Sequence, residues 1–302
     1  MTSPNRTYIP VATLIPRAPL PGGVGLLIRF AGQWVAGETL EDAVRYAKDV
    51  NARGIDAILN LLGEHYEEKR LVERTLKEYL RILAAIEKGD LGAGVSVKPS
   101  QIGLEFGRAY CESSLKPVFD KVRAMGGFLW IDMESSRFTE DTLAMYADLH
   151  ERHHDVGLCL QANLRRTPKD LERILEYGGK VRLTKGAYRE TPEIAHRSRE
   201  EIDTAYLRLL KILFEKGDHF AVATHDGNLI EEAIRLSHAH KRIWEFQFLK
   251  GVRDPLKRDL VAKKYRVVEY VPYGPNWLPY FLRRLRERPR NVLTMVRSFV
   301  QG

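Results

Sequence analysis

Polar side chains that can bind a charged ligand lie within or directly after a series of short apolar segments in this 302-residue sequence. They are Lys98, Asp132, Gln161, Arg182, Thr184, Lys185, Thr224, His225, Asp226, Glu245 and Gln247. If the apolar segments are parallel strands of one barrel, their carboxyl ends meet at one mouth, so these side chains converge there. Three of them, Lys98, Arg182 and Lys185, are cations. The pattern therefore predicts a site for an anionic or electron-rich ligand.

A divalent metal ion is the alternative ligand for such a site, because it prefers imidazole and carboxylate donors. Those donors would come from Asp132, Glu134, His225 and Asp226. The three cations at the same mouth would repel a dication, so we expect no metal. Gly186 and Ala187 lack bulk and allow a ligand to approach the backbone closely. No G-x-G-x-x-G follows a strand, so a Rossmann fingerprint is absent.

A second group with chemical potential stands near the carboxyl terminus, in a segment that we expect to be helical over residues 277–288. Tyr280, Arg283, Arg284 and Glu287 are spaced i, i+3, i+4 and i+7, which places them on one helix face together with Trp277. Paired guanidinium groups match the two oxygens of a carboxylate. An exposed face with an Arg–Glu pair has the same pattern, and spacing alone leaves the two interpretations open.

The elements that position these residues alternate between strands and helices. Eight short apolar segments, at 55–61, 94–98, 128–132, 156–161, 181–184, 220–224, 243–248 and 266–271, have the length and composition of buried strands. Longer amphipathic segments separate them, such as 67–88, where Leu71, Leu76, Leu80 and Leu83 form an apolar stripe. Eight such units over about 250 residues predict an α/β fold, a closed (βα)8 barrel. An open doubly wound sheet is the alternative.

The first residues differ from the rest in composition. Five prolines precede Gly22, a density that prevents helix formation and is unsuited to a central strand. We therefore expect residues 1–36 to form an amino-terminal arm and residues 37–302 to form the barrel domain. Thr39 followed by Asp42 predicts a helix start, and Gly54 predicts its end.

Composition restricts the class of protein further. The chain is 44% hydrophobic and 29% charged, as is usual for a globular enzyme. Two cysteines cannot form a disulfide framework, and no apolar stretch is long enough for a membrane helix. The amino terminus lacks the pattern of a signal peptide, so we expect a cytoplasmic location. Residues 250–302 carry 13 Lys and Arg against 4 Asp and Glu. That excess suits nucleic acid, an anionic membrane surface or an anionic ligand.

These residues resemble the proline dehydrogenase family, in ordered pieces over about residues 37–290. The pieces are VSVK at 95–98, QIGL at 101–104, IDME at 131–134, LQANLRRT at 160–167, RLTKGAY at 182–188, ATHD at 223–226, EFQ at 245–247, VPYG at 271–274 and YFLRR at 280–284. The resemblance implies a distorted (βα)8 TIM barrel whose last helix lies over the barrel mouth. It also implies FAD-dependent oxidation of L-proline to Δ1-pyrroline-5-carboxylate, with electrons passed to a quinone and peripheral contact with the membrane.

The resemblance also implies roles for individual residues. The substrate would be bound by Lys98, Asp132, Leu249, Tyr270, Tyr280, Arg283, Arg284 and Glu287, with the two arginines on the proline carboxylate. FAD would contact Asp132, Gln161, Arg182, Lys185, Gly186, Ala187, Tyr188, Thr224, His225 and Gln247. Asp226 stands where relatives often have asparagine, and the proline-rich start differs from the helical arm of many relatives.

Two functions from other classes compete with this one. A (βα)8 lyase, aldolase or hydrolase would use Lys98 or Lys185 as a Schiff-base nucleophile. A nucleic-acid-binding protein would use the basic carboxyl-terminal segment, but that segment lacks exposed aromatic residues interleaved along a groove, so we expect no nucleic-acid partner.

Overall fold

Eight parallel strands close into a barrel in the computed structural model, which describes residues 32–287 and, for 283–287, the backbone alone. The strands follow one another around the barrel, and β1 closes it by pairing with both β2 and β8. They are β1 (Asp56–Leu61), β2 (Ala93–Val97), β3 (Leu129–Ile131), β4 (Val156–Gln161), β5 (Lys180–Thr184), β6 (His219–Ala223), β7 (Ile243–Leu249) and β8 (Val267–Tyr273). The predicted barrel is confirmed, with every strand within two residues of its predicted ends.

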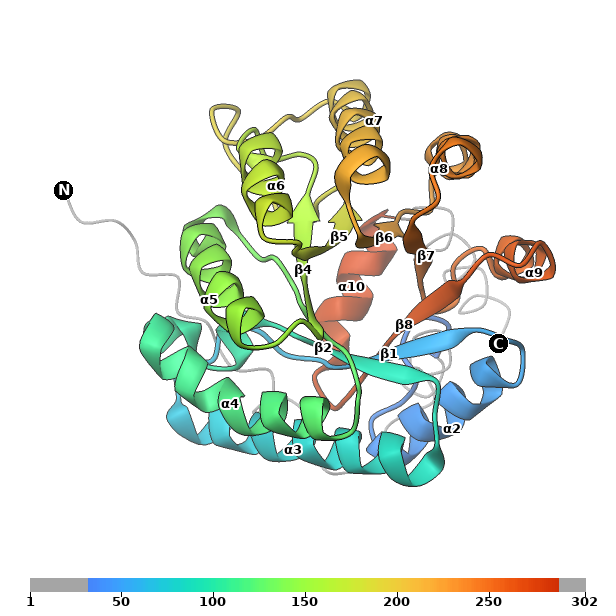
Figure 1. Ribbon diagram of the computed structural model, residues 1–302. Coiled ribbons are helices and arrows are strands. Elements are labelled where there is room, and N and C mark those ends of the chain that lie inside the picture. The colour runs from blue at the N-terminus through green and yellow to red at the C-terminus, as the bar shows by residue number, and fades with distance from the viewer. Residues whose placement is uncertain (1–31, 288–302) are drawn as a thin grey trace, which may run out of the picture.

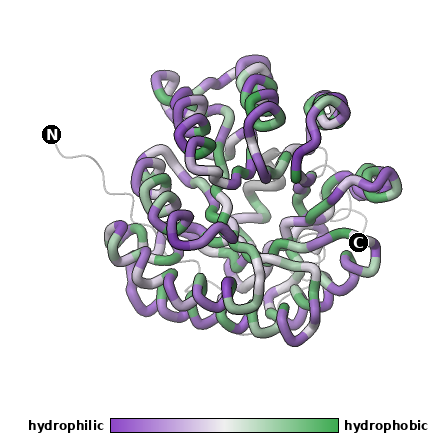
Figure 2. Tube along the Cα trace, in the orientation of Figure 1, coloured by the Kyte–Doolittle hydropathy of each residue, from purple (hydrophilic) through white to green (hydrophobic). Residues whose placement is uncertain are grey.

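Helices connect the strands and cover the outside of the barrel (Figure 1). They are α2 (Leu40–Asn51), α3 (Lys69–Gly89), α4 (Arg108–Ala124), α5 (Thr139–Arg152), α6 (Thr167–Glu176), α7 (Arg199–Lys216), α8 (Gly227–Ala239), α9 (Asp254–Ala262) and α10 (Trp277–Glu287), with 3-10 turns η2 (Pro99–Gln101), η3 (Leu104–Phe106) and η4 (Ser136–Phe138). Figure 2 shows polar residues predominating on the outward sides of this helical layer. The strands are accordingly covered on both faces, and all six residues of β4 are buried.

Local signals explain where helices begin and which face they bury. The Thr39 hydroxyl accepts from the Asp42 backbone N–H at 3.2 Å, which is the predicted start of α2. The predicted apolar stripe of α3 is correct at Leu83, which is buried, whereas Leu71, Leu76 and Leu80 are only half-buried. The buried face of α3 consists of Val72, Thr75, Tyr79, Ile82, Leu83 and Ile86.

Helix α10 lies inside the ring formed by the other helices rather than beside it (Figure 1). Its residues Trp277, Tyr280 and Phe281 form a small apolar core with Leu62, Val252, Trp34 and Val35. Leu62 follows β1 and Val252 follows β7, so this core sits at the carboxyl ends of the strands. The helix therefore covers the barrel mouth, as the resemblance implied.

Residues 32–36, which the sequence placed in the arm, pack against the barrel. The Ala36 backbone N–H donates to the Pro272 carbonyl at 2.9 Å, and Lys250 Nζ donates to the Gly32 carbonyl at 2.6 Å. The rest of the predicted arm, residues 1–31, lies outside the described residues. Over residues 32–287, no helix has the length and apolar character needed to span a bilayer.

Candidate functional site

Asp132 is the centre of a buried polar cluster at the carboxyl ends of β2, β3, β5 and β8. Its Oδ1 accepts from the Ser96 hydroxyl at 2.7 Å and from Arg182 Nη1 at 2.7 Å. Its Oδ2 accepts from Lys98 Nζ at 3.0 Å and from the Tyr270 hydroxyl at 2.8 Å. We call these five residues the Asp132 cluster. Four predicted site residues, Lys98, Asp132, Arg182 and Tyr270, are thus brought into direct contact.

The charges in this cluster stabilise one another. Burial opposes ionisation of Asp132, but the attraction of Lys98 and Arg182 and the hydrogen bonds from Ser96 and Tyr270 outweigh it and lower the pKa of the carboxyl to about 2. Burial likewise opposes the charge on Lys98, yet Asp132 raises the pKa of that amine well above its usual range. The cluster therefore holds a carboxylate between two permanent cations.

Arg182 is held on three sides and has one donor to spare. Its Nε donates to Gln247 Oε1 at 2.6 Å, and its Nη1 donates to Ser96 and Asp132. Its guanidinium lies 4.6 Å from the centre of the Trp130 ring. Nη2 is buried and has no hydrogen-bond partner among the residues described. A buried unpaired N–H group is costly, so this atom is suited to a ligand that accepts a hydrogen bond.

The loop after β5 brings predicted cofactor residues next to the cluster. Gly186 has a φ of +110°, and a Cβ there would stand 2.0 Å from Asn163 Oδ1. Only glycine fits that position without displacement. The Ala187 backbone N–H donates to Gln161 Oε1 at 3.3 Å, and Gln161 Nε2 donates to the Glu134 carbonyl at 2.8 Å. The loop thus presents backbone, with little side-chain bulk, at the mouth.

Lys185 belongs to a separate group at the rim. Its amine contacts Asp203 and lies 3.0 Å from Asp226 Oδ2, which also accepts from Arg199 at 2.8 Å. Burial opposes the charge on Asp226, but hydrogen bonds from Lys185 and Arg199 lower the pKa of the carboxyl to about 2. Asp226 also caps α8 through the Asn228 N–H, a role that asparagine would fill equally well.

The remaining predicted residues lie around the same mouth. His225 Nε2 accepts from the Leu249 backbone N–H at 3.0 Å, the Tyr188 hydroxyl donates to Glu64 at 3.3 Å, and Thr224 is buried. Tyr280 is buried in the core beneath α10, with half-buried Leu249 against it. Arg283, Arg284 and Glu287 lie on α10 by their backbone, but their side chains lie outside the described residues.

Sequence reasoning missed residues that act from beneath the site. Ser96 is fully buried two residues before Lys98, so the period-two alternation of a strand was the available signal. Glu134, which the sequence offered only as a metal ligand, accepts from the Ser100 N–H at 2.7 Å and hydroxyl at 2.6 Å. Those bonds fix the turn that follows Lys98.

One possible group of metal ligands does assemble among the described residues. Glu64, His65 and Glu134 bring ligand atoms within 4.8 Å of one another. However, Glu134 is engaged by Ser100, and His65 Nδ1 lies 3.0 Å from Glu105. The side chains of this group are thus already hydrogen-bonded to neighbouring residues, and the group shares only Glu134 with the four metal ligands considered in the sequence.

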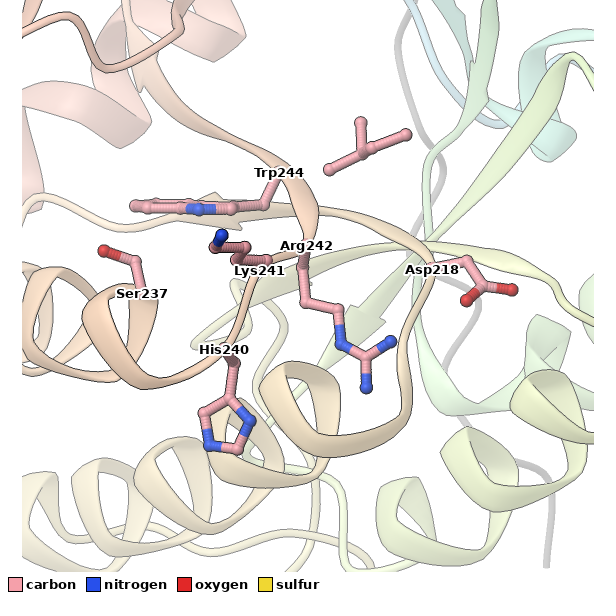
Figure 3. Close-up of a pocket in the computed structure, with 7 residues that line it drawn as sticks. Asp218, Ser237, His240, Lys241, Arg242 and Trp244 are labelled. Atoms are coloured by element: carbon pink, nitrogen blue, oxygen red, sulfur yellow. The ribbon is translucent and has the colours of Figure 1, made fainter.

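An open hollow of about 710 Å³ occurs at the other end of the barrel, where β6 and β7 begin. Figure 3 shows Lys241 close to Trp244 on one side and Asp218 on the opposite side. The Arg242 guanidinium donates hydrogen bonds to the Phe214 and Glu215 carbonyls at the end of α7. The hollow contains none of the predicted site residues, and barrel chemistry belongs at the carboxyl ends of strands.

Known proteins are similar in sequence to this chain over most of its length. A family model described as Proline dehydrogenase matches residues 43–296. The chain is 30% identical over 274 residues to proline dehydrogenase 1 of Bacillus subtilis subsp. natto, covering 90% of this chain and 91% of that protein. It is 31% identical over 280 residues to proline dehydrogenase of Deinococcus radiodurans, covering 90% of each.

A solved structure supports the fold independently. Proline utilization A (PutA) of Bdellovibrio bacteriovorus, inactivated by N-propargylglycine, has a TM-score of 0.80 to this chain at 23% identity. The similarity covers 86% of this chain but 32% of that longer protein, and it shows the barrel alone. Because the family model and the curated relatives both span the barrel and its mouth, the chain belongs to the proline dehydrogenase family, an oxidoreductase family that acts on proline.

Proposed function

We propose that this protein is a flavoenzyme that oxidises L-proline to Δ1-pyrroline-5-carboxylate, using FAD and passing the electrons to a quinone. The observation that carries the proposal is the geometry of Arg182. Arg182 is a buried cation bonded to Asp132, and its Nη2 is buried without a hydrogen-bond partner among the described residues. It lies in a barrel whose mouth is covered by the helix that carries Arg283 and Arg284.

The residues present fit a flavin. A flavin ring system is planar and accepts hydrogen bonds along one edge, and Arg182 Nη2 is a buried donor without a partner. Gly186 and Ala187 are exposed and carry little side-chain bulk, and at Gly186 an added Cβ would meet Asn163. The residues that would hold FAD are Asp132, Gln161, Arg182, Lys185, Gly186, Ala187, Tyr188, Thr224, His225 and Gln247.

Proline would lie between these residues and α10. Arg283 and Arg284 would bind its carboxylate through paired donors, with Glu287 beside them. Tyr270, Tyr280 and Leu249 would bound the apolar ring, and Lys98 and Asp132 would complete the pocket. A rigid five-membered ring held at one end has few orientations left, so catalysis would rest mainly on positioning.

When bound, FAD supplies the two-electron acceptor for the hydride that leaves C5 of proline. The chain's own residues would orient the ring. Asp132 is unsuited to be the base that deprotonates the amine, because its pKa is about 2 and both of its oxygens already accept two hydrogen bonds. The amine proton would therefore pass to solvent before the hydride leaves.

An absorption spectrum of the purified protein, recorded without oxygen before and after addition of L-proline, tests the proposal. We expect a flavin band that bleaches on addition of L-proline and stays unchanged with D-proline. N-propargylglycine, which inactivates the Bdellovibrio protein, should also inactivate this one. If the protein binds flavin but its absorption band does not bleach with L-proline, then L-proline is not the substrate.

The arginine pair can be tested separately. Arg283→Met and Arg284→Met should each raise the KM for proline at least tenfold, because a carboxylate would lose one of two charge-assisted partners. The flavin content should stay that of the wild type. Normal proline affinity in both variants would show that the substrate carboxylate is bound elsewhere.

The Schiff-base alternative is weakened by the environment of both lysines. An amine nucleophile needs a lowered pKa, whereas Asp132 raises the pKa of Lys98 well above its usual range. Lys185 is paired with Asp203 and Asp226. A colourless protein that retained aldolase activity would revive this alternative.

We further propose a cytoplasmic location, with peripheral contact to the membrane that holds the quinone. The support is the basic carboxyl-terminal segment, since an anionic bilayer attracts polybasic segments. When the protein is sedimented with vesicles that contain phosphatidylserine, we expect it in the pellet at low salt and in the supernatant at about 0.5 M NaCl. Equal retention by uncharged vesicles would contradict the electrostatic part of the proposal.

A further inference from the structure

A line of buried polar side chains runs through the barrel from Arg182 towards the opposite end. Gln247 Oε1 accepts from Arg182 Nε at 2.6 Å, and Gln247 Nε2 donates to Glu245 Oε1 at 2.6 Å. The other oxygen of Glu245, Oε2, lies 3.2 Å from Arg266 Nε. Glu245 and Gln247 are each about 4% exposed, whereas the Arg266 side chain is 55% exposed. The sequence counted Glu245 among the polar residues expected at the mouth, but the structure bonds it to Gln247 and Arg266 instead.

The order of donors and acceptors along this line permits one orientation of the Gln247 amide. Arginine has only donors, so the amide oxygen must face Arg182 and the NH2 group must face the other way. An NH2 group inside the barrel needs an acceptor, and the Glu245 carboxylate supplies it. If the amide rotated by 180°, its NH2 group would meet Arg182 Nε and its oxygen would meet a carboxylate. Glu245 thus holds the amide in the orientation that Arg182 requires.

The support matters to Arg182 because the hydrogen bonds at Nη1 and Nε set the orientation of its remaining nitrogen, Nη2. Nη1 is held by Ser96 and Asp132 on one side, and Nε is held by Gln247 on the other. These bonds fix the plane of a rigid guanidinium, and with it the direction of Nη2. Loss of the Gln247 bond would leave the group anchored at Nη1 only.

We infer that Glu245 is a positioning residue, which acts through Gln247 to hold the Arg182 cation in the orientation in which it would stabilise the negative charge that reduction adds to the bound flavin. The inference rests on the proposed function for its chemical consequence, but its structural part concerns this chain's own residues. Glu245 itself would touch neither proline nor the flavin.

Two substitutions at this position separate orientation from charge. Glu245→Leu removes the acceptor, so the Gln247 amide is free to rotate. Glu245→Gln retains one carbonyl oxygen for two donors. That oxygen should stay with buried Gln247, because Arg266 is half exposed and already has Asp56 at 3.2 Å as another partner. The glutamine variant should therefore keep Arg182 in place, although the charge is gone.

The flavin midpoint potential is the readout that a purely structural role would not move. In Glu245→Leu we expect it to fall by about 30 mV, which is a tenfold change in a two-electron equilibrium. The kcat for proline should fall about tenfold while its KM stays within twofold, since the carboxylate partners are elsewhere. Glu245→Gln should stay within twofold of the wild type in both constants, with an unchanged potential.

Val222→Ala is the matched control, because it removes a fully buried side chain from neighbouring β6 without touching the line. It should lower thermal stability and leave the potential unchanged. An unchanged potential in Glu245→Leu, or an equal fall in Glu245→Gln, would overturn the inference, the second by showing that charge rather than orientation matters.

Crystal structures of the two variant apoproteins test the same inference without any flavin. The contact between Arg182 Nε and Gln247 Oε1 should be lost in Glu245→Leu and kept in Glu245→Gln. If it survives in the leucine variant, the positioning role is wrong. A wild-type protein that holds no flavin would instead refute the proposed function, and these structures would still decide the role of Glu245.

Discussion

At the scale of single residues, the mouth is built around one carboxylate with four donors. Asp132 accepts from Ser96, Lys98, Arg182 and Tyr270, so each buried charge in the cluster has a partner. The atoms without partners are informative for the same reason. Arg182 Nη2 and Asn163 Oδ1 are among the buried atoms that have none in the described part of the chain, so both are available to the flavin proposed above.

Gly186→Ala tests the close backbone approach at this scale. A Cβ at Gly186 would stand 2.0 Å from Asn163 Oδ1, and the φ of +110° is strained for alanine. We expect flavin content per protein, measured by absorbance, to fall at least fivefold. Gly107→Ala is the control, since Gly107 has a φ of +99° with nothing within 4 Å of its added Cβ. That variant should lose only the stability due to strain, about 1–3 kcal/mol, and keep its flavin. Equal flavin loss in both variants would contradict the role of the close contact.

The sequence predicted these residues to different degrees, for physical reasons. Lys98, Asp132 and Arg182 are polar residues at the carboxyl ends of apolar segments, and barrel geometry alone makes them converge. Asn163 was not singled out, because its approach to Gly186 depends on how two loops fold together. The line from Arg182 to Arg266 was likewise hidden, since it depends on the lateral register of β5, β7 and β8.

At the scale of elements, α10 is the part of the fold that departs from a regular barrel. In the sequence, one face of this helix carries aromatic and arginine residues. Their spacing alone did not decide whether that face is exposed to solvent or binds a ligand. The structure resolves the aromatic half, because Trp277 and Tyr280 are buried over the mouth, together with Phe281, which the prediction did not include. It also adds the packing of Trp34, whose ring centre is 5.7 Å from that of Phe281. Residues 32–36 and α10 therefore support each other.

Trp34→Ala tests that support. Removing a buried tryptophan takes away one wall of α10 and should cost about 3–5 kcal/mol of unfolding free energy. Because α10 carries the proposed carboxylate clamp, the KM for proline should rise at least fivefold while flavin content is retained. Trp244→Ala is the control, as Trp244 packs on Phe246 and Tyr265 at the other end of the barrel. It should lower stability without raising the KM. A rise in both variants would show that any destabilisation produces the effect.

At the scale of the whole molecule, closure of the barrel brings charged groups from several strands into one buried interior. Strand order and the (βα)8 class could be predicted, because alternation of apolar and amphipathic segments follows from the fold itself. The ionisation state of the buried charged groups could not be predicted, because it depends on how deeply each group is buried and on its partners from other strands. The whole fold therefore determines that Asp132, buried as it is, remains ionised at neutral pH.

The acid stability of the protein tests this last point. The pKa of Asp132 is lowered from 3.8 to about 2, so the folded state is stabilised by its ionisation above pH 4 and loses that stabilisation as the pH falls towards 2. The full contribution is about 2 kcal/mol, and about half should be lost by pH 3. Asp132→Asn leaves Lys98 and Arg182 unpaired and should cost about 3–5 kcal/mol at pH 6. Urea unfolding at pH 6 and pH 3 should therefore show the gap between wild type and variant narrowing by about 1 kcal/mol. If the gap stays constant, the carboxyl of Asp132 titrates alike in the folded and unfolded chains, and the cluster does not stabilise its charge.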